Sequence, residues 1–115
     1  MNLKWFSSKI RLVALVESLG SDLYIDSVFI FKADDFKDAF EKAIKLGKNQ
    51  EEEYINANNK RVCWRLKEII SLDLIKQEEL DGVEVYSEPI EIQTDKREPF
   101  DVVYHPEKSE PTQTI

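Results

Sequence analysis

Hydrophobic and polar residues alternate along two stretches of the N-terminal third of the chain. In residues 4–16 the even-numbered positions are mostly apolar, with Ser8 as an exception. The odd-numbered positions are mostly polar, with Val13 and Leu15 as exceptions. A period of two is typical of a strand with one buried face. Residues 23–33 form a second such stretch, and the turn-forming residues 17–22 between them predict a long hairpin. Residues 28–31 are apolar on both parities, which indicates a central strand covered on both faces or a bulge near Ser27.

Residues 34–47 have the clearest helical pattern in the chain. Their apolar side chains recur at intervals of three and four, on one helical face: Phe36, Ala39, Phe40, Ala43 and Ile44. Asp34 or Asp35 can accept hydrogen bonds from the amides of the first turn. Gly47 is expected to end the helix in a left-handed conformation. We expect this apolar face to pack on a sheet.

The second half of the domain predicts a further hairpin. Asn58 and Asn59 tolerate positive φ and lie between residues 50–56 and a strand at 61–70. In that strand Trp64 has the parity of the buried face and Arg65 has the opposite parity. Residues 71–80 are ambiguous and could include a helical turn, and residues 83–87 predict a short last strand.

All four prolines follow residue 88. Since proline cannot donate to a ladder and disfavours helix, we expect residues 89–115 to form an irregular tail. The predicted fold is α+β, with one domain over residues 1–88. Its elements follow along the chain in the order β-β-α-β-β, with a short fifth strand. The strands form a small antiparallel sheet, and the one helix packs on one face of this sheet.

Four short motifs lie in order along the chain: Trp5-Phe-Ser7, Tyr54-Ile-Asn56, Val62-Cys-Trp-Arg65 and Gly82-Val-Glu-Val-Tyr-Ser87. Together they resemble a bacterial family catalogued as domain of unknown function 4288. The resemblance covers about residues 4 to 88 and implies a small single-domain protein. It brings no assigned activity and no catalytic residues. Asn58-Asn59 departs from the Asp-Gly or Asn-Gly turn that we expect at this hairpin.

The chain has 115 residues and a net charge of -7, with the negative excess in its second half. Phosphate contacts need concentrated Lys and Arg, so this balance argues against nucleic acid as a partner. The single cysteine excludes an internal disulfide and fits a reducing compartment. The sequence has no apolar run of the length that spans a membrane. We therefore expect a cytoplasmic protein without a membrane partner.

The residues that could support catalysis are few. One His and one Cys, 42 positions apart, do not predict a transition-metal site. The three glycines are isolated, so no phosphate-binding loop is present. Cationic neighbours could lower the pKa of the Cys63 thiol and so activate it. A lone cysteine in a strand, however, more often serves as a small packed side chain. We expect no catalytic residues, no metal and no cofactor, although enzymatic activity through carboxylates or Cys63 stays an alternative.

One face of the sheet is expected to present a basic strip, here called the predicted strip. If the first strand lies beside residues 61–70, this face carries Ser7, Lys9, Arg11, Arg61 and Arg65, with Lys67. Arginine there could bind a carboxylate or phosphate. The alternative is a solvated face on which these cations pair with acidic residues across strands.

A non-enzymatic protein–protein interaction module is the leading functional prediction. The acidic surface and an apolar segment at residues 99–104 favour it, with partner contacts or self-association through Trp5, Phe100, Val102 and Tyr104. An immunity-like protein that covers a basic toxin is one form of this prediction. The other class is a small-ligand or anion-binding domain that uses the predicted strip.

Overall fold

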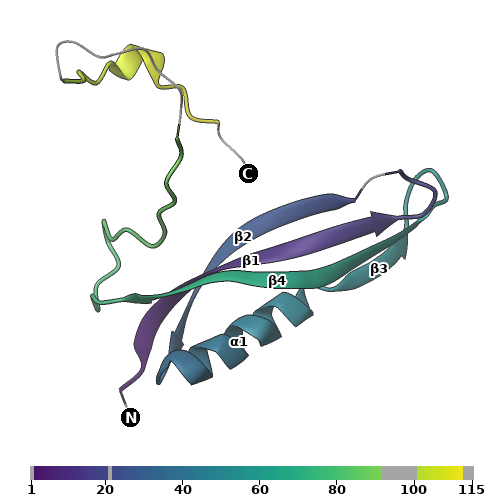
Figure 1. Ribbon diagram of the computed structural model, residues 1–115, viewed down its shortest axis with the longest axis horizontal. Coiled ribbons are helices and arrows are strands. Elements are labelled where there is room, and N and C mark those ends of the chain that lie inside the picture. Colours follow the sequence, from purple (N-terminus) through teal and green to yellow (C-terminus); the bar gives the residue numbers. More distant parts are fainter. Residues whose placement is uncertain (1, 21, 92–100, 113–115) are drawn as a thin grey trace.

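The computed structural model describes residues 2–20, 22–91 and 101–112 and confirms an α+β fold. A four-stranded antiparallel sheet has one helix on one face (Figure 1). The elements follow in the order β1 (Lys4–Val16), β2 (Leu23–Ala33), α1 (Phe36–Asn49), β3 (Glu52–Ile55) and β4 (Arg61–Ile75). A single turn of 3₁₀ helix, Pro106–Lys108, lies in the tail, whose described residues are otherwise irregular.

The strand order in the sheet is β2-β1-β4-β3. β1 and β2 pair as a hairpin, as predicted, and β1 also pairs with β4 along its length. β2 is consequently an edge strand, and the expectation that residues 28–31 belong to a central strand is wrong. The Asn59 backbone has a φ of 60° in the β3–β4 turn, which confirms the predicted positive φ there.

The register of β4 shifts twice against β1, between Lys9 and Ile10 and between Arg11 and Leu12. Each shift leaves one residue of β4, Ile70 and Lys67, without a partner, and this is the pattern of a β-bulge. The bulges lie in β4 and not near Ser27, where the apolar run had suggested one. Because of them, Leu66, Ile69 and Leu72 all lie on the face that α1 covers. Arg65 lies on the opposite face, here called the open face, as predicted.

The buried face of α1 consists of small residues. Ala39, Ala43 and Gly47 are buried, whereas Phe36 and Phe40 of the predicted stripe are 53% and 48% exposed. Asp35 caps the helix by accepting from the Asp38 N–H at 2.8 Å. Small side chains let the helix axis approach the sheet, while Phe36 still contacts Phe6 edge to face at 5.1 Å.

Gly47 lies inside the helix, so the prediction that it ends the helix is wrong. Its φ is not positive, and α1 continues to Asn49. An ideal Cβ at this position would lie 2.6 Å from Leu66 Cδ1 and 3.3 Å from Ile10 Cγ2. Close approach of α1 to β1 and β4, and not turn geometry, therefore accounts for this glycine.

Residues 83–87 do not form the predicted fifth strand. Residues 83–88, here called the strap, reach the open face of the sheet instead of extending one of its edges. Lys9 in β1 holds the strap, since its Nζ donates to Tyr86 Oη at 3.0 Å and to Glu88 Oε2 at 2.6 Å. The strap contacts the sheet face through its side chains, so its backbone has no strand to pair with. For this reason residues 83–87 do not form the predicted fifth strand.

Among the described residues, no helix has the length and apolar character that crossing a membrane requires.

Candidate interaction surface

The outer edge of β2 is the longest unpaired strand edge among the described residues. β2 has 11 residues, pairs with β1 on one side only, and keeps an unbroken register with it from Leu23 to Ala33. It contains no proline and no bulge, two of the devices that blunt an edge. Its outward N–H and C=O groups can therefore continue the ladder with a further strand.

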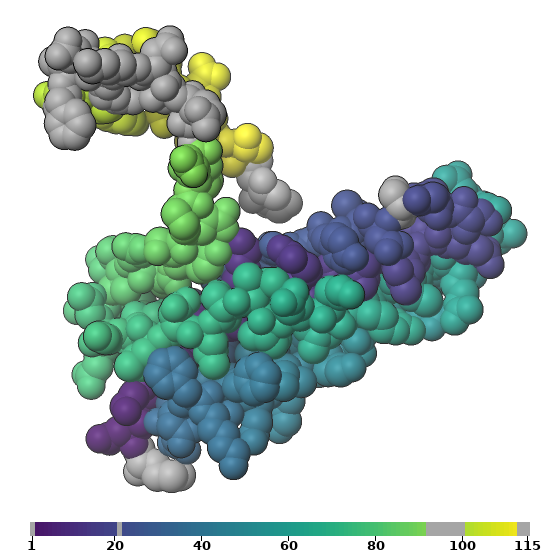
Figure 2. All heavy atoms as spheres, in the orientation of Figure 1, coloured from purple at the N-terminus to yellow at the C-terminus, as the bar shows by residue number. Residues whose placement is uncertain are grey.

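Apolar side chains are exposed along both faces of this edge. The β2 surface is defined here as Leu23, Tyr24, Ile25, Val28 and Ile30, all at least 41% exposed. By register with β1, Tyr24, Val28 and Ile30 lie on the open face. Figure 2 shows the dark blue segment of β2 along one rim of the domain. An exposed apolar strand of this length is typical of a contact surface.

The opposite edge of the sheet is much less suited to pairing. β3 has only four residues, Glu52–Ile55, of which two are glutamates. Short, charged edge strands resist association with other strands. The two edges differ in length and charge, and β2 is the one that favours a partner.

Two charged side chains, Asp26 and Lys32, interrupt the apolar character of β2, and both lie on the open face. Asp26 accepts two hydrogen bonds from Arg11, at 2.7 and 2.8 Å. The Lys32 Nζ lies 5.0 Å from the centre of the Trp5 ring. Its carbonyl accepts from Lys42 Nζ at 2.8 Å, so the end of β2 next to α1 is partly occupied. A strand that pairs at Lys32 would displace this bond, whereas the stretch before Lys32 has no such bond among the described residues.

The predicted strip is divided into two groups. Ser7, Lys9 and Arg11 follow one another on the open face of β1. Hydrogen bonding to Arg11 lowers the pKa of Asp26, and hydrogen bonding to Glu88 and then to Tyr86 raises the pKa of Lys9 above its ordinary value. Ser7 is buried beside the strap, and its Oγ has no hydrogen-bond partner among the described residues.

Arg61 and Arg65 lie at the other end of the sheet, where β4 passes β3. Arg61 Nε donates to Glu53 Oε1 at 2.6 Å, and Arg65 donates to Glu53 Oε2 at 3.2 Å. These two bonds lower the pKa of Glu53, with the bond from Arg61 contributing most. Four of the five cations of the predicted strip, Lys9, Arg11, Arg61 and Arg65, are therefore paired with carboxylates of the same chain, whereas Lys67 has no ion pair among the described residues. This pairing is the alternative that the sequence had left open for the open face.

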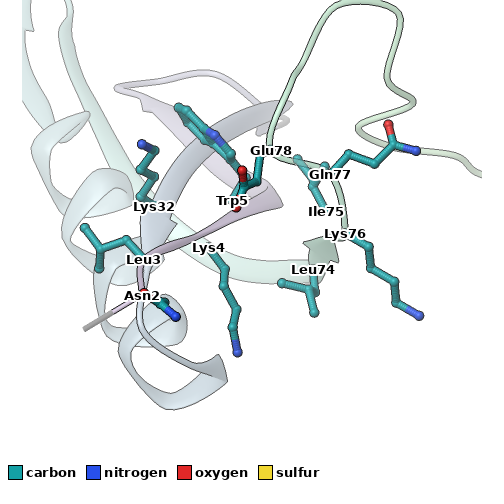
Figure 3. Close-up of a pocket in the computed structure, with 10 residues that line it drawn as sticks. All are labelled: Asn2, Leu3, Lys4, Trp5, Lys32, Leu74, Ile75, Lys76, Gln77 and Glu78. Carbon is teal, nitrogen blue, oxygen red and sulfur yellow. The ribbon is translucent and has the colours of Figure 1, made fainter.

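Trp5 lines a hollow of about 670 Å³ at the end of the sheet where β1 begins and β4 ends. Three lysines also line it, Lys4, Lys32 and Lys76, together with Leu74, Ile75 and Glu78. Figure 3 shows Lys32 beside the Trp5 ring, whereas Lys4 and Lys76 extend toward the other side. Among the described residues, no carboxylate lies within ion-pair distance of these three lysines. The hollow is therefore more basic than the predicted strip, and parity along one strand could not have identified it.

The other predicted partner residues belong to the tail. Val102 and Tyr104 are 73% and 70% exposed and lie in an irregular segment. Phe100 lies outside the described residues. The structure therefore does not bring Trp5 together with the two described members of this set.

Within residues 2–20, 22–91 and 101–112, no cluster of three or more His, Cys, Asp or Glu side chains has the arrangement of a metal site. Cys63 is a half-buried free thiol on the open face of β4, opposite Leu15. Arg61, a cation that neighbours the thiol, is engaged with Glu53. This part of the chain therefore offers no nucleophile–base pair built around the thiol.

The β2 surface was not among the predicted site residues. The signal for it was present, because residues 28–31 are apolar on both parities. That pattern is typical of a central strand with two covered faces, but it also occurs in an edge strand that meets a partner. Only the strand order distinguishes the two cases.

Comparison with known proteins gives one match. No curated protein and no solved structure matches the chain significantly. The model of a family described as a domain of unknown function, DUF4288, matches residues 5–87, which include the sheet except Lys4, the whole of α1 and most of the strap. The chain belongs to the DUF4288 family.

Proposed function

We propose that the protein is a non-enzymatic protein–protein interaction module whose contact surface is the outer edge of β2. The observation that carries this proposal is the combination of an 11-residue unpaired edge with the exposed apolar β2 surface. Main-chain hydrogen bonds to an added strand would supply affinity, and side chains on alternate positions would supply specificity.

The pairing of charges on the open face supports this proposal over anion binding by the predicted strip. An anion at Arg11 or Arg65 would have to displace Asp26 or Glu53, which already satisfy those guanidinium groups. A strand added at β2 would displace none of these bonds, because they join side chains on the open face and not backbone groups of the outer edge. The edge is available without such a cost.

The test introduces a lysine on the edge. In Val28→Lys the new ammonium would enter the contact, and we expect the affinity for a captured partner to fall by roughly tenfold or more. Val28 is 43% exposed, so the fold should tolerate the change. Leu19→Lys, in the exposed turn before β2, is the matched control with the same chemistry away from the edge.

The partner is first captured from host extract on immobilised wild-type protein, identified, and purified. Its dissociation constant is then measured with the wild type and with both variants. A partner that binds Val28→Lys as tightly as wild type would show that the edge of β2 is not the contact surface.

The hollow beside Trp5 supports a second candidate function, the binding of a small anionic ligand. Lys32, which has no described carboxylate partner and lies beside the indole ring, favours an anion in a hollow of about 670 Å³ that Lys4 and Lys76 also line. Titration with inorganic phosphate or citrate, followed by the fluorescence of a Trp64→Phe variant, tests it through Trp5 alone. An unchanged signal with both anions would remove this candidate.

A further inference from the structure

From the edge of β2 we infer that two copies of this chain pair through it, antiparallel, about a two-fold axis that runs along the sheet normal and passes midway between the two copies of Phe29. This inference rests on the proposed function and names the partner as a second copy. The sheet would become a continuous eight-stranded layer, twice the four strands of one copy. Each α1 would lie on the same side of it.

The alternation of side chains restricts the possible registers. Odd-numbered residues of β2 lie on the face that α1 covers and even-numbered residues on the open face. Residues directly opposite one another in an antiparallel pair lie on the same face. A two-fold axis along the sheet normal must therefore place odd residues opposite odd and even opposite even, so one residue of β2 lies opposite its own counterpart and the axis passes between the two.

Charge complementarity selects one of these registers. Asp26 and Lys32 are the only charged residues of β2, and they lie three positions before and three positions after Phe29. With the axis at Phe29, Asp26 of each copy lies opposite Lys32 of the other. An axis at Asp26 would bring two carboxylates together, and an axis at Val28 would place Asp26 opposite Ile30. Opposite charges in register stabilise a strand pair, and like charges destabilise it.

The same register covers exposed apolar surface. It places Val28 of each copy opposite Ile30 of the other, twice about the axis, and these side chains are 43% and 45% exposed in the single chain. The Lys32 Nζ is available, since it contacts the Trp5 ring and no described carboxylate. An edge-to-edge contact buries limited area, so we expect a reversible dimer in exchange with the monomer.

A disulfide at the axis tests the register. In a background with Cys63→Ala, the variant Phe29→Cys should form a covalent dimer under mild oxidation. Its two Cα atoms would lie about 4.5 to 5.5 Å apart, within the range a disulfide spans. Ile25→Cys is the matched control on the same face, because its counterpart in the other copy is Ala33. Covalent dimer from Ile25→Cys but not from Phe29→Cys would overturn the register.

A charge reversal tests the contact without a cysteine. Lys32→Glu would place two glutamates opposite two aspartates and should weaken dimerisation by about tenfold or more in sedimentation equilibrium. Lys45→Glu makes the same charge change on the exposed side of α1 and should leave the dimer unchanged.

The pairing of two copies would be overturned if the wild-type protein stayed monomeric at every concentration. It would also be overturned if Lys32→Glu did not weaken the dimer. Neither result would remove the proposed function, because Val28→Lys tests the edge against whichever protein is captured. The two proposals can thus fail separately.

Discussion

At the scale of single residues, Gly47 determines how closely the helix approaches the sheet. Ala39 and Ala43 share its face, so α1 presents almost no side-chain volume toward Ile10 and Leu66. A glycine inside a helix costs about 1 kcal/mol relative to alanine. The close contact with the sheet explains why a position with that cost is occupied by glycine.

Gly47→Val should lower the free energy of unfolding by about 2 kcal/mol, because its methyl groups overlap Leu66 and Ile10 in a packed core. Urea denaturation followed by circular dichroism measures the change. Lys45→Val is the matched control, since it places the same residue at an exposed position of α1, and it should cost about 0.5 kcal/mol. Equal losses in the two variants would show that helix propensity, and not packing, is responsible.

Several carboxylates are held ionised by specific hydrogen bonds. Arg61 lowers the pKa of Glu53, Lys9 lowers that of Glu88, and the Leu66 N–H lowers that of Glu51. A carboxyl group with a lowered pKa in the folded state stabilises the fold above its ordinary pKa. That contribution disappears as the pH falls through the lowered value.

The free energy of unfolding should therefore decrease as the pH falls below about 4, the ordinary range of carboxyl pKa values. Glu53→Gln removes one of these groups, so its unfolding curve should differ from wild type at neutral pH and coincide with it in strong acid. Thermal unfolding at a series of pH values provides the comparison. A difference that persists in strong acid would mean that Glu53 acts through packing and not through its charge.

At the scale of elements, the strap gives the open face a cover that the strand pattern did not predict. The strap and β4 together line a hollow of about 280 Å³ above Ser7, and Ile75 at its base is 7% exposed. The contacts of Lys9 with Tyr86 and Glu88 fix the strap at its far end. The strap thus belongs to the folded domain although it adds no strand to the sheet.

Two truncated chains separate the strap from the tail. A chain that ends at Glu88 should keep the stability of the full chain to within about 0.5 kcal/mol, because residues beyond it contribute little described packing. A chain that ends at Gly82 should lose about 1–2 kcal/mol as Ile75 and its neighbours become exposed. Chemical denaturation measures both. If the two truncated chains were equally stable, the strap would not be a structural part of the domain.

The periodic pattern predicted most of the elements but not their neighbours. The alternation in residues 4–16 and the face of α1 determined the β1–β2 hairpin, the helix and its cap at Asp35, because these depend on local spacing. The edge position of β2 depends on β1 pairing with β4, a long-range contact that leaves no mark in local alternation. The bulges at Ile70 and Lys67 could have been found, since apolar residues three apart at Leu66, Ile69 and Leu72 do not fit a period of two.

At the scale of the whole molecule, the sheet is asymmetric. One edge is short and acidic, and the other is long, apolar and unpaired among the described residues. Four of the five basic side chains that had suggested an anion site, all except Lys67, are paired with carboxylates within the chain. These two facts together direct our interpretation from ligand binding to strand pairing between proteins.

Hydrogen–deuterium exchange of β2 measured against protein concentration tests the central claim most directly. Amides on the outer side of residues 25–31 should exchange quickly in dilute solution and slowly in concentrated solution, because pairing with a second copy protects them. In Lys32→Glu they should exchange quickly at both concentrations. Exchange of β2 that does not change with concentration in the wild type would contradict the pairing of two copies through this edge.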